Sequence, residues 1–406
     1  MKVAHILRRF DKSDWGGIET VCLNLCKELI KLNIDVEILS TQAMSSKNSE
    51  NYDGVPVTRF EYFYPYISFE KGKKSQFDRK GGNPFSFKLI KYLKKSKPDL
   101  IHLHTMGFLG AQVVRFANQQ KIPVVTSLHG GHFDVISNEK KSFSDLYKKT
   151  LSYARFLRPI YNPDNILMKS DGIICVGKNE AIKAKSALPN KEIAYIPNGV
   201  NTKIFDCEKN PDFYPDLLGI SPEKKVLLYQ SRIDGQKNQN FLIDIAVELR
   251  KTNQLNNYHL FINGPVMNED YYQGMKKRVK ELNLADHFSF NRGFKPESRE
   301  HIQSFVNAEA FLFPTIHEPF GIVALEAWAS KIPVISSARG GLQYFLEHKK
   351  NSLIAAIDKP EDWANYIVDL NNTEKASLIE TAYQQVVNSF SWENCAKSSK
   401  ELYSKF

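Results

Sequence analysis

The sequence predicts an α/β protein of two Rossmann-like, doubly wound domains that face a central cleft. Short apolar runs that suit buried strands alternate with helical stretches along nearly all of the 406 residues, which is typical of parallel sheets covered by helices. The alternation stops in a turn-rich span, 201–222, and then restarts. A length of 406 residues suits two or three domains of ordinary size.

In the first half, the predicted helices carry their apolar residues at helical spacing, as Val21, Leu25, Leu29 and Leu32 do. We expect strands at Lys2–Leu7, Asp35–Ser40, Val55–Phe60, Leu100–His104, Val124–Leu128, Gly172–Val176 and Ile193–Ile196. We expect helices at Ile18–Leu32, Phe85–Ser96, Leu109–Gln119, Phe143–Leu157 and Glu180–Leu188.

In the second half the same alternation resumes after the turn-rich span. We expect strands at Lys225–Gln230, His259–Ile262, Phe288–Phe290, Ala310–Phe313 and Pro333–Ser336. We expect helices at Gln239–Lys251, Tyr271–Leu282, Ser298–Asn307 and Gly321–Ser330, followed by two or three terminal helices. Open α/β sheets bind ligands at the carboxyl ends of their strands, so the motifs that follow strands are the candidate site residues.

The stretch from His317 to Ala329 carries two carboxylates around the start of a predicted helix. Glu318 precedes the helix, where free N–H groups favour anions, and Glu326 lies inside an otherwise apolar helix. A buried carboxylate is costly unless it is paired or hydrogen-bonded. The stretch therefore suits a sugar phosphate, and it equally suits a capped core helix in which Glu326 bonds to another helix.

Other candidate residues also follow predicted strands. Arg232 and Lys237 are five residues apart in one loop and suit a diphosphate, although a solvated loop is the simpler alternative. His129 could donate to a hydroxyl or serve as an acid or base, although a histidine at a strand end is more often structural. We expect His102 and His104 to point to opposite faces of their strand, with His104 the better candidate.

Two further features restrict the chemistry. Gly16 and Gly17 form a turn before the first helix that lets a ligand approach the backbone, but a plain tight turn is an equal alternative. The turn is not the GxGxxG fingerprint of dinucleotide binding. No Asp-x-Asp motif occurs, so the sequence offers no obvious ligands for a divalent metal on a phosphate.

The cysteines and the ends of the sequence bear on location. The five cysteines are scattered, which indicates a reducing compartment without a disulfide framework. Cys22 and Cys26 are one helical turn apart, and because no histidine or second cysteine pair is near them in the sequence, we expect core packing and not a zinc site. We see no signal-peptide core and no membrane span, so we expect a cytoplasmic location.

Charge is unevenly distributed. Residues 1–205 hold 32 Lys and Arg against 19 Asp and Glu, a net charge of +13, whereas the remainder holds 23 against 26, a net charge of −3. A basic half indicates an anionic partner. In the segment 140–158, Phe143, Tyr147, Leu151 and Ala154 are at helical spacing among basic residues, which fits peripheral membrane contact and fits an ordinary core-facing helix about equally.

With these residues in order, the chain resembles the family-four retaining glycosyltransferases of the GT-B fold over nearly its whole length. The most specific match is Glu318-Pro319-Phe320-Gly321 with Glu326, which is similar to the E-x7-E motif of that family and its EPFG form. Supporting matches are Gly16–Glu19, Pro197–Val200, Arg232 with Lys237, and the ending Phe390–Asn394. The resemblance implies an acceptor-binding domain at 1–205, a nucleotide-sugar-binding domain at 206–388 and a helix at 389–406 that crosses back to the first domain.

The resemblance also implies residue roles. Glu318 would contact hydroxyls of the donor sugar, Glu326 would bind ribose hydroxyls, and Arg232 and Lys237 would stabilise the departing diphosphate. His129 would reach the sugar. The other implied donor-binding residues are Gly16, Gly17, Gly264, Pro265, Arg292, Gly293, Phe294, Pro319, Phe320, Gly321 and Ile322. No metal and no other cofactor is expected.

The implied function is transfer of a sugar from a nucleotide-diphosphate donor, a UDP-sugar in the first place, with retention of configuration. The acceptor would be a glycan or lipid-linked molecule of cell-envelope polysaccharide, lipopolysaccharide or glycolipid synthesis, reached at the inner membrane face through the basic first half. The alternatives are a non-catalytic nucleotide-sugar-binding subunit and a nucleotide-sugar epimerase. Nucleic-acid binding is not expected, because the basic residues form no recognised motif.

Overall fold

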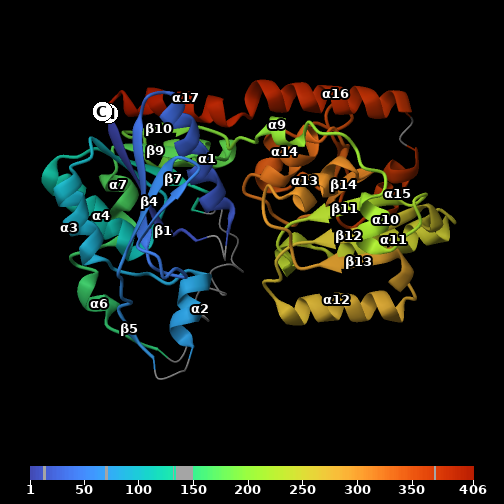
Figure 1. Cartoon of the computed structure of the whole chain (residues 1–406), viewed down its shortest axis with the longest axis horizontal. Coiled ribbons are helices and arrows are strands. Elements are labelled where there is room, and N and C mark those ends of the chain that lie inside the picture. Colours follow the sequence, from blue (N-terminus) through green and yellow to red (C-terminus); the bar gives the residue numbers. More distant parts are fainter. Residues whose placement is uncertain (12–14, 69–71, 131, 134–149, 370–371) are drawn as a thin grey trace. The chain divides into compact units, whose positions relative to one another are not determined.

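The computed structural model describes residues 1–11, 15–68, 72–130, 132–133, 150–369 and 372–406. The chain forms two compact units, and each is described by itself. The first unit comprises Met1–Asn198 together with Trp392–Phe406, and the second comprises Gly199–Ser391 (Figure 1). The last helix of the chain therefore belongs to the first unit.

The described part of the first unit holds an eight-stranded sheet in the order β10-β9-β7-β6-β1-β2-β4-β3. All neighbouring strands of this sheet are parallel except β3 and β4, which are antiparallel. The strands are β1 Lys2–Arg9, β2 Asp35–Thr41, β3 Ser49–Tyr52, β4 Val55–Phe60, β6 Leu100–Leu103, β7 Val124–Leu128, β9 Gly172–Cys175 and β10 Glu192–Tyr195. The parallel sheet agrees with the α/β class that the alternating pattern predicts.

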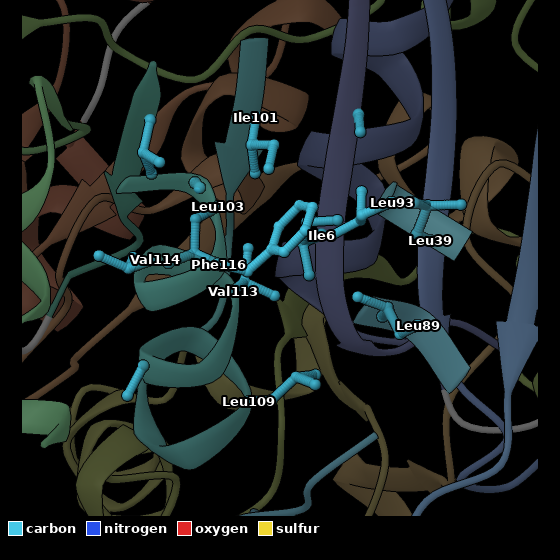
Figure 2. Packing of buried hydrophobic residues seen from close by; sticks show 14 of the residues in the cluster. Ile6, Leu39, Leu89, Leu93, Ile101, Leu103, Leu109, Val113, Val114 and Phe116 are labelled. Carbon is cyan, nitrogen blue, oxygen red and sulfur yellow. The ribbon is translucent and has the colours of Figure 1, made fainter. Parts of the chain in front are cut away.

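Helices cover both faces of this sheet. The helices of the unit within the described residues are α1 Gly17–Lys31, α2 Lys73–Lys80, α3 Phe87–Ser96, α4 Gly107–Gln120, α6 Ala154–Leu157, α7 Ile166–Lys169, α8 Lys178–Ala187 and α17 Trp392–Tyr403, with a 3-10 turn, η2, at Pro163–Asn165. Of these, α2 and α6 lie beyond the sheet, near the strand β5, Tyr66–Ile67 (Figure 1). Successive side chains of a strand point to opposite faces. In β1, Ile6 packs against Leu103 and Phe116 on the α3 and α4 side (Figure 2). The neighbouring His5 instead faces the helix α1.

The second unit holds a six-stranded parallel sheet in the order β13-β12-β11-β14-β15-β16 within the described residues. The strands are β11 Lys225–Gln230, β12 Tyr258–Asn263, β13 Phe288–Asn291, β14 Ala310–Phe313, β15 Val334–Ser336 and β16 Leu353–Ile354. The α-helices are α9 Thr202–Phe205, α10 Phe213–Leu218, α11 Asn240–Lys251, α12 Glu269–Glu281, α13 Arg299–Val306, α14 Ile322–Ala329, α15 Pro360–Asp369 and α16 Asn372–Ser389. The 3-10 turns are η3 Gly235–Lys237, η4 Leu255–Asn257, η5 Ala285–His287 and η6 Gly340–Tyr344.

One predicted helix, Phe143–Leu157, is wrong at Leu151–Ser152 within the described residues. Residues 134–149 of the expected helix Phe143–Leu157 lie outside the described residues, and Leu151–Ser152 forms a strand, β8. This strand pairs antiparallel with β5, Tyr66–Ile67, and only Ala154–Leu157 is helical. The backbone of Leu151 and Ser152 is therefore paired with a strand far away in the sequence, which helical spacing cannot indicate.

Among the helices of the described ranges, none combines the length and apolar character needed to cross a bilayer.

Candidate active site at the carboxyl ends of the second sheet

The candidate residues of the second unit follow four strands that are neighbours in its sheet. Arg232 follows β11, Gly264 follows β12, Arg292 follows β13, and Glu318 follows β14 after a short loop. The order of these strands is β13-β12-β11-β14, and all of them are parallel. Parallel strands end at the same edge of a sheet, so the fold brings these four loops together.

The centre of this site is an ion pair between Lys237 and Glu318. The Nζ atom of Lys237 lies 2.6 Å from Oε2 of Glu318, and the exposed fraction of Lys237 is only 3%. The pair joins two loops that are 81 residues apart in the sequence. A lysine buried this deeply needs a partner, and Glu318 supplies the opposite charge. The sequence places Lys237 and Glu318 in one site, and the structure shows that they touch.

The loop that carries Lys237 is held by hydrogen bonds at its start. The Asp234 side chain accepts from the N–H groups of Gln236 and Lys237, so it caps η3 and fixes the backbone at the lysine. The side-chain amide of Gln239 donates to the carbonyl oxygen of Arg232 at 2.8 Å. The guanidinium of Arg232 is exposed and makes no hydrogen bond or ion pair with a described residue. The loop after β11 thus carries two cationic side chains: Lys237, which is paired with Glu318, and Arg232, which is unpaired among the described residues.

The loop that carries Glu318 is supported by glycines that sequence reasoning does not single out. Gly341 donates its N–H to the carbonyl oxygen of Glu318 at 2.6 Å. Gly340 has φ +70°, and a Cβ atom there would lie 2.3 Å from the same carbonyl oxygen. A Cβ on Gly341 would lie 2.0 Å from the carbonyl oxygen of Pro319. The sequence does show a glycine pair, which begins four residues after the end of the predicted strand Pro333–Ser336. A glycine pair alone, however, does not indicate which loop it supports.

Helix α14 starts directly after this loop. Gly321 is its N-cap with φ +97°, a conformation that glycine adopts readily and residues with a Cβ do not. No side chain caps the helix, so the first N–H groups of the helix after Phe320 have no side-chain acceptor within the described residues. These N–H groups and the positive end of the helix dipole can bind an anion or hydroxyl oxygens.

Glu326 lies on α14 and contacts a second helix. Its Oε1 atom is 3.5 Å from Nε2 of His301, which belongs to α13. The other oxygen, Oε2, is buried and has no hydrogen-bond partner among the described residues. The simpler alternative, a bond from Glu326 to another helix, is thus represented only by this 3.5 Å contact, which is an ion pair when His301 is protonated. A buried acceptor without a partner is costly, so the second oxygen is left with an unmet hydrogen-bonding requirement.

The loops after β12 and β13 pack closely on the loop after β11. A Cβ atom on Gly264 would lie 1.8 Å from the carbonyl oxygen of Ser231, and one on Gly293 would lie 3.1 Å from the nitrogen of Pro265. Arg292 is exposed and its guanidinium forms an ion pair with Glu269, 2.8 Å between Nη2 and Oε1. The glycines are thus explained by close approach of the backbone, whereas Arg292 is engaged with a neighbouring helix.

Phe294 is half-buried and its ring lies 6.1 Å from that of Phe261. It therefore has a structural contact of its own, beside any contact with a ligand. The carbonyl oxygen of Pro265 accepts from the N–H of Ile233, which again ties the loop after β12 to the loop after β11. The three loops form one connected support.

In the first unit, Gly16 and Gly17 begin α1. Gly16 is the N-cap, and its N–H donates to Oε2 of Glu19 at 3.1 Å. Glu19 is buried and forms an ion pair with Arg9 at 3.5 Å; burial raises the pKa of Glu19. A Cβ on Gly17 would meet no atom of a described residue within 4 Å. The glycine turn at the helix start is thus present as expected.

His129 ends a chain of hydrogen-bonded imidazoles. Its Nε2 atom lies 3.0 Å from Nδ1 of His104, whose Nε2 lies 3.0 Å from Nδ1 of His5. Burial lowers the pKa of His129 to about 4, so the ring is neutral at physiological pH. The expectation that His102 and His104 face opposite sides is wrong, because their ring centroids are 4.0 Å apart. Residues two apart in a strand point to the same face.

Comparison with known proteins gives two family matches. Residues 15–204 match the family described as Glycosyltransferase Family 4, and residues 212–385 match the family described as Glycosyl transferases group 1. The chain is 25% identical to an uncharacterised glycosyltransferase of Methanocaldococcus jannaschii, over 99% of this chain and 98% of that protein. It is also 25% identical to a D-inositol 3-phosphate glycosyltransferase of Corynebacterium urealyticum, over 98% of this chain and 92% of that protein.

A solved structure has a similar fold. The Anabaena protein Alr3699/HepE, in complex with UDP and glucose, aligns with a TM-score of 0.71 at 18% identity, over 100% of both chains. At this identity the likeness concerns the fold alone.

Proposed function

The chain belongs to the family-four glycosyltransferases, and from this premise we propose that it transfers a sugar from a nucleotide-diphosphate donor with retention of configuration. The GT-B fold that this family implies is confirmed by the similar fold of the solved Anabaena structure. The observation that carries the proposal is the buried ion pair between Lys237 and Glu318, beside the unpaired guanidinium of Arg232. We propose a UDP-sugar as the donor, because the relative of similar fold was solved with UDP and glucose.

In the proposed reaction the bond between the anomeric carbon and the diphosphate oxygen breaks, and a bond to the acceptor oxygen forms on the same face of the sugar. The proton of the acceptor hydroxyl passes to an oxygen of the leaving phosphate. Negative charge then builds on the diphosphate, where Lys237 and Arg232 would stabilise it. These two cations are our basis for proposing that the reaction needs no metal.

Glu318 and the start of α14 would hold the donor sugar. When the diphosphate attracts Lys237, Glu318 is free to accept hydrogen bonds from sugar hydroxyls. The N–H groups of Phe320, Gly321 and Ile322 would contact phosphate and sugar oxygens. The buried, unpartnered Oε2 of Glu326 would accept from the ribose hydroxyls.

The loops after β12 and β13 would contact the base of the nucleotide through the backbone at Gly264 and Gly293. We propose that His129 donates to the sugar as a neutral imidazole, in keeping with the lowered pKa of about 4. Gly17 would allow close approach of the diphosphate, because the space around it is open among the described residues.

We propose that the acceptor is anionic and carried on a membrane surface. The first unit exposes apolar side chains on β5, β8 and α6: Ile67 is 52% exposed, Leu151 66% and Phe156 67%. Ile67 and Leu151 are paired residues of the β5–β8 ribbon, so they lie side by side. The guanidinium of Arg155 lies 4.7 Å from the centre of the Phe156 ring. Exposed apolar residues beside basic ones suit the interface of an anionic bilayer.

The lipid proposal has a direct measurement. Flotation with anionic vesicles at low and moderate salt should recover the protein at low salt, and Leu151→Ser with Phe156→Ser should reduce the recovery. Neutral vesicles are the control. Absence of binding to anionic vesicles at low salt would refute the proposed membrane-bound acceptor. The proposed sugar donor would be unaffected, because the acceptor could then be a soluble anion, as for the D-inositol 3-phosphate glycosyltransferase.

The donor proposal is tested with Glu318→Gln. Hydrolysis and transfer from a panel of UDP-, GDP- and ADP-sugars should be measured for the wild type and this variant, and turnover should fall strongly in the variant. Glu309→Gln is the matched control, because Glu309 also pairs with a lysine, Lys375, at 2.6 Å. Unchanged turnover in Glu318→Gln would contradict the proposal. Conversion of the donor sugar without any acceptor would identify an epimerase instead.

A further inference from the structure

Three side chains from β1 and α1 meet in the core of the first unit, outside the residues assigned to sugar transfer. They are His5, Cys22 and Cys26, and their ligand atoms all lie within 4.8 Å of one another. All three residues have an exposed fraction of 0%. Cys22 and Cys26 are four residues apart on a helix, so both sulfur atoms face the same side, toward β1.

The ring of His5 is oriented as that of a metal ligand would be. Its Nδ1 lies 3.0 Å from Nε2 of His104, a contact that orients the ring plane. Its other nitrogen, Nε2, is buried and has no hydrogen-bond partner among the described residues. An unsatisfied buried nitrogen is costly, and a histidine that binds a metal characteristically uses its second nitrogen in a hydrogen bond.

A second group with metal-binding spacing, His5 with His102 and His104, fits less well. Both nitrogens of His104 are hydrogen-bonded to other imidazoles. His102 uses Nδ1 with the Tyr403 hydroxyl at 2.6 Å and Nε2 with the Ser127 hydroxyl at 2.7 Å. The group of His5, Cys22 and Cys26 depends on neither of these histidines, and its own histidine nitrogen, Nε2 of His5, is engaged in no hydrogen bond with a described residue.

We propose that His5, Cys22 and Cys26 are three protein ligands of a thiophilic d10 cation, Zn2+ or Cu+. Two thiolates and one imidazole are the ligands that these cations prefer. Binding replaces the proton on each thiol with a sulfur–metal bond, and the protons are released to solvent. The cation links β1 to the middle of α1, the helix that begins at Gly16 and Gly17.

The core packing expected for Cys22 and Cys26 is present, since both are fully buried. His5 lies beside them because β1 packs against α1.

The test measures metal, not sugar transfer. The full chain, produced without a histidine tag in medium with added zinc or copper, should hold about one equivalent of Zn or Cu by elemental analysis. Metal-free protein titrated with Co2+ should show sulfur-to-cobalt charge-transfer absorption. Cys26→Ser and His5→Gln should lose both signals. Cys175→Ser, at a buried cysteine of β9, and Cys207→Ser, at an exposed one, should keep them.

Circular dichroism of each variant distinguishes loss of the site from loss of the fold. A folded Cys26→Ser chain without metal supports the proposal. A wild-type chain with less than about a tenth of an equivalent of Zn and Cu after loading, and no cobalt–sulfur absorption, would overturn it. Neither result depends on whether the chain transfers sugars, so failure here is distinct from failure of the proposed function.

Discussion

The N–H of Gly341 donates to the carbonyl oxygen of Glu318 at 2.6 Å, so the loop after β15 determines where the candidate glutamate lies. Gly340, beside it, has φ +70° and approaches the same carbonyl oxygen. The position of the Glu318 carboxylate thus depends on a glycine pair that itself carries no functional group. This dependence can be measured.

Gly340→Ala should reduce both activity and stability. The added Cβ would lie 2.3 Å from the Glu318 carbonyl oxygen, and the left-handed backbone alone costs about 1–2 kcal/mol for a residue with a Cβ. Urea denaturation should show a lower free energy of unfolding, and donor turnover should fall in the fraction that stays folded. Gly274→Ala in α12, where a Cβ meets nothing within 4 Å, is the control and should be neutral or stabilising. Equal behaviour of the two variants would contradict this account.

Lys237→Met should lower kcat/KM by roughly 100- to 1000-fold, the effect typical of removing one charge-stabilising group from a transition state. The lysine also neutralises Glu318, so some stability should be lost with it. Steady-state kinetics with the best donor of the panel would show the effect. Lys375→Met removes another lysine paired with a glutamate at 2.6 Å and should leave kcat/KM unchanged. A decrease in kcat/KM of less than tenfold in Lys237→Met would show that Lys237 is not a catalytic residue.

Glu326→Gln should weaken donor binding through the ribose. A hydrogen bond to a charged group contributes about 1.5–3 kcal/mol, so we expect at least about a tenfold rise in Kd by calorimetry. Wild-type protein should lose a similar factor with a donor that lacks the ribose 2′- and 3′-hydroxyls. The variant should lose little more with that donor. Additive losses would show that Glu326 does not contact the ribose and serves only its contact with His301.

Stability should fall in mild acid because of His129. Its pKa in the folded chain is about 4, below the ordinary value of 6.5, so the unfolded chain binds the proton more readily. The contribution of the neutral ring is complete above about pH 6.5 and is lost as the pH falls toward 4. His129→Gln should therefore reduce the slope of unfolding free energy against pH between these values. His317→Gln, outside the imidazole chain, is the control, and an equal slope in wild type and His129→Gln would contradict the assignment.

The order of strands and helices could be predicted from the sequence because apolar runs and helical spacing are local. The strands Val124–Leu128 and Lys225–Gln230 have the predicted bounds, and α1 differs from its predicted bounds by one residue at each end. The two strands of the β5–β8 ribbon could not be predicted, because the paired residues Ile67 and Leu151 are far apart in the sequence. Helical spacing at Leu151 gave the wrong structure there, since pairing with a distant strand outweighed local preference.

In the candidate site, residue types and strand ends indicated which side chains matter. They could not indicate contacts between loops. The partner of Lys237, the glycine support of Glu318 and the contact of Glu326 with His301 all depend on how separate loops pack. His5 was missed for the same reason, because nothing near it in the sequence distinguishes it from a core residue. The roles assigned to the site residues stay predictions until the variants are measured.

The contact between His102 and Tyr403 has a consequence for how the chain folds during synthesis. The two residues are 301 positions apart and belong to the same unit, which therefore lacks its last helix until Tyr403 has left the ribosome. The second unit is complete at Ser391, before that moment. Domains generally fold in order from the N-terminus during translation. Here the first unit to be made is the last to be finished, because α17 packs against α1 only once the whole chain has been synthesised.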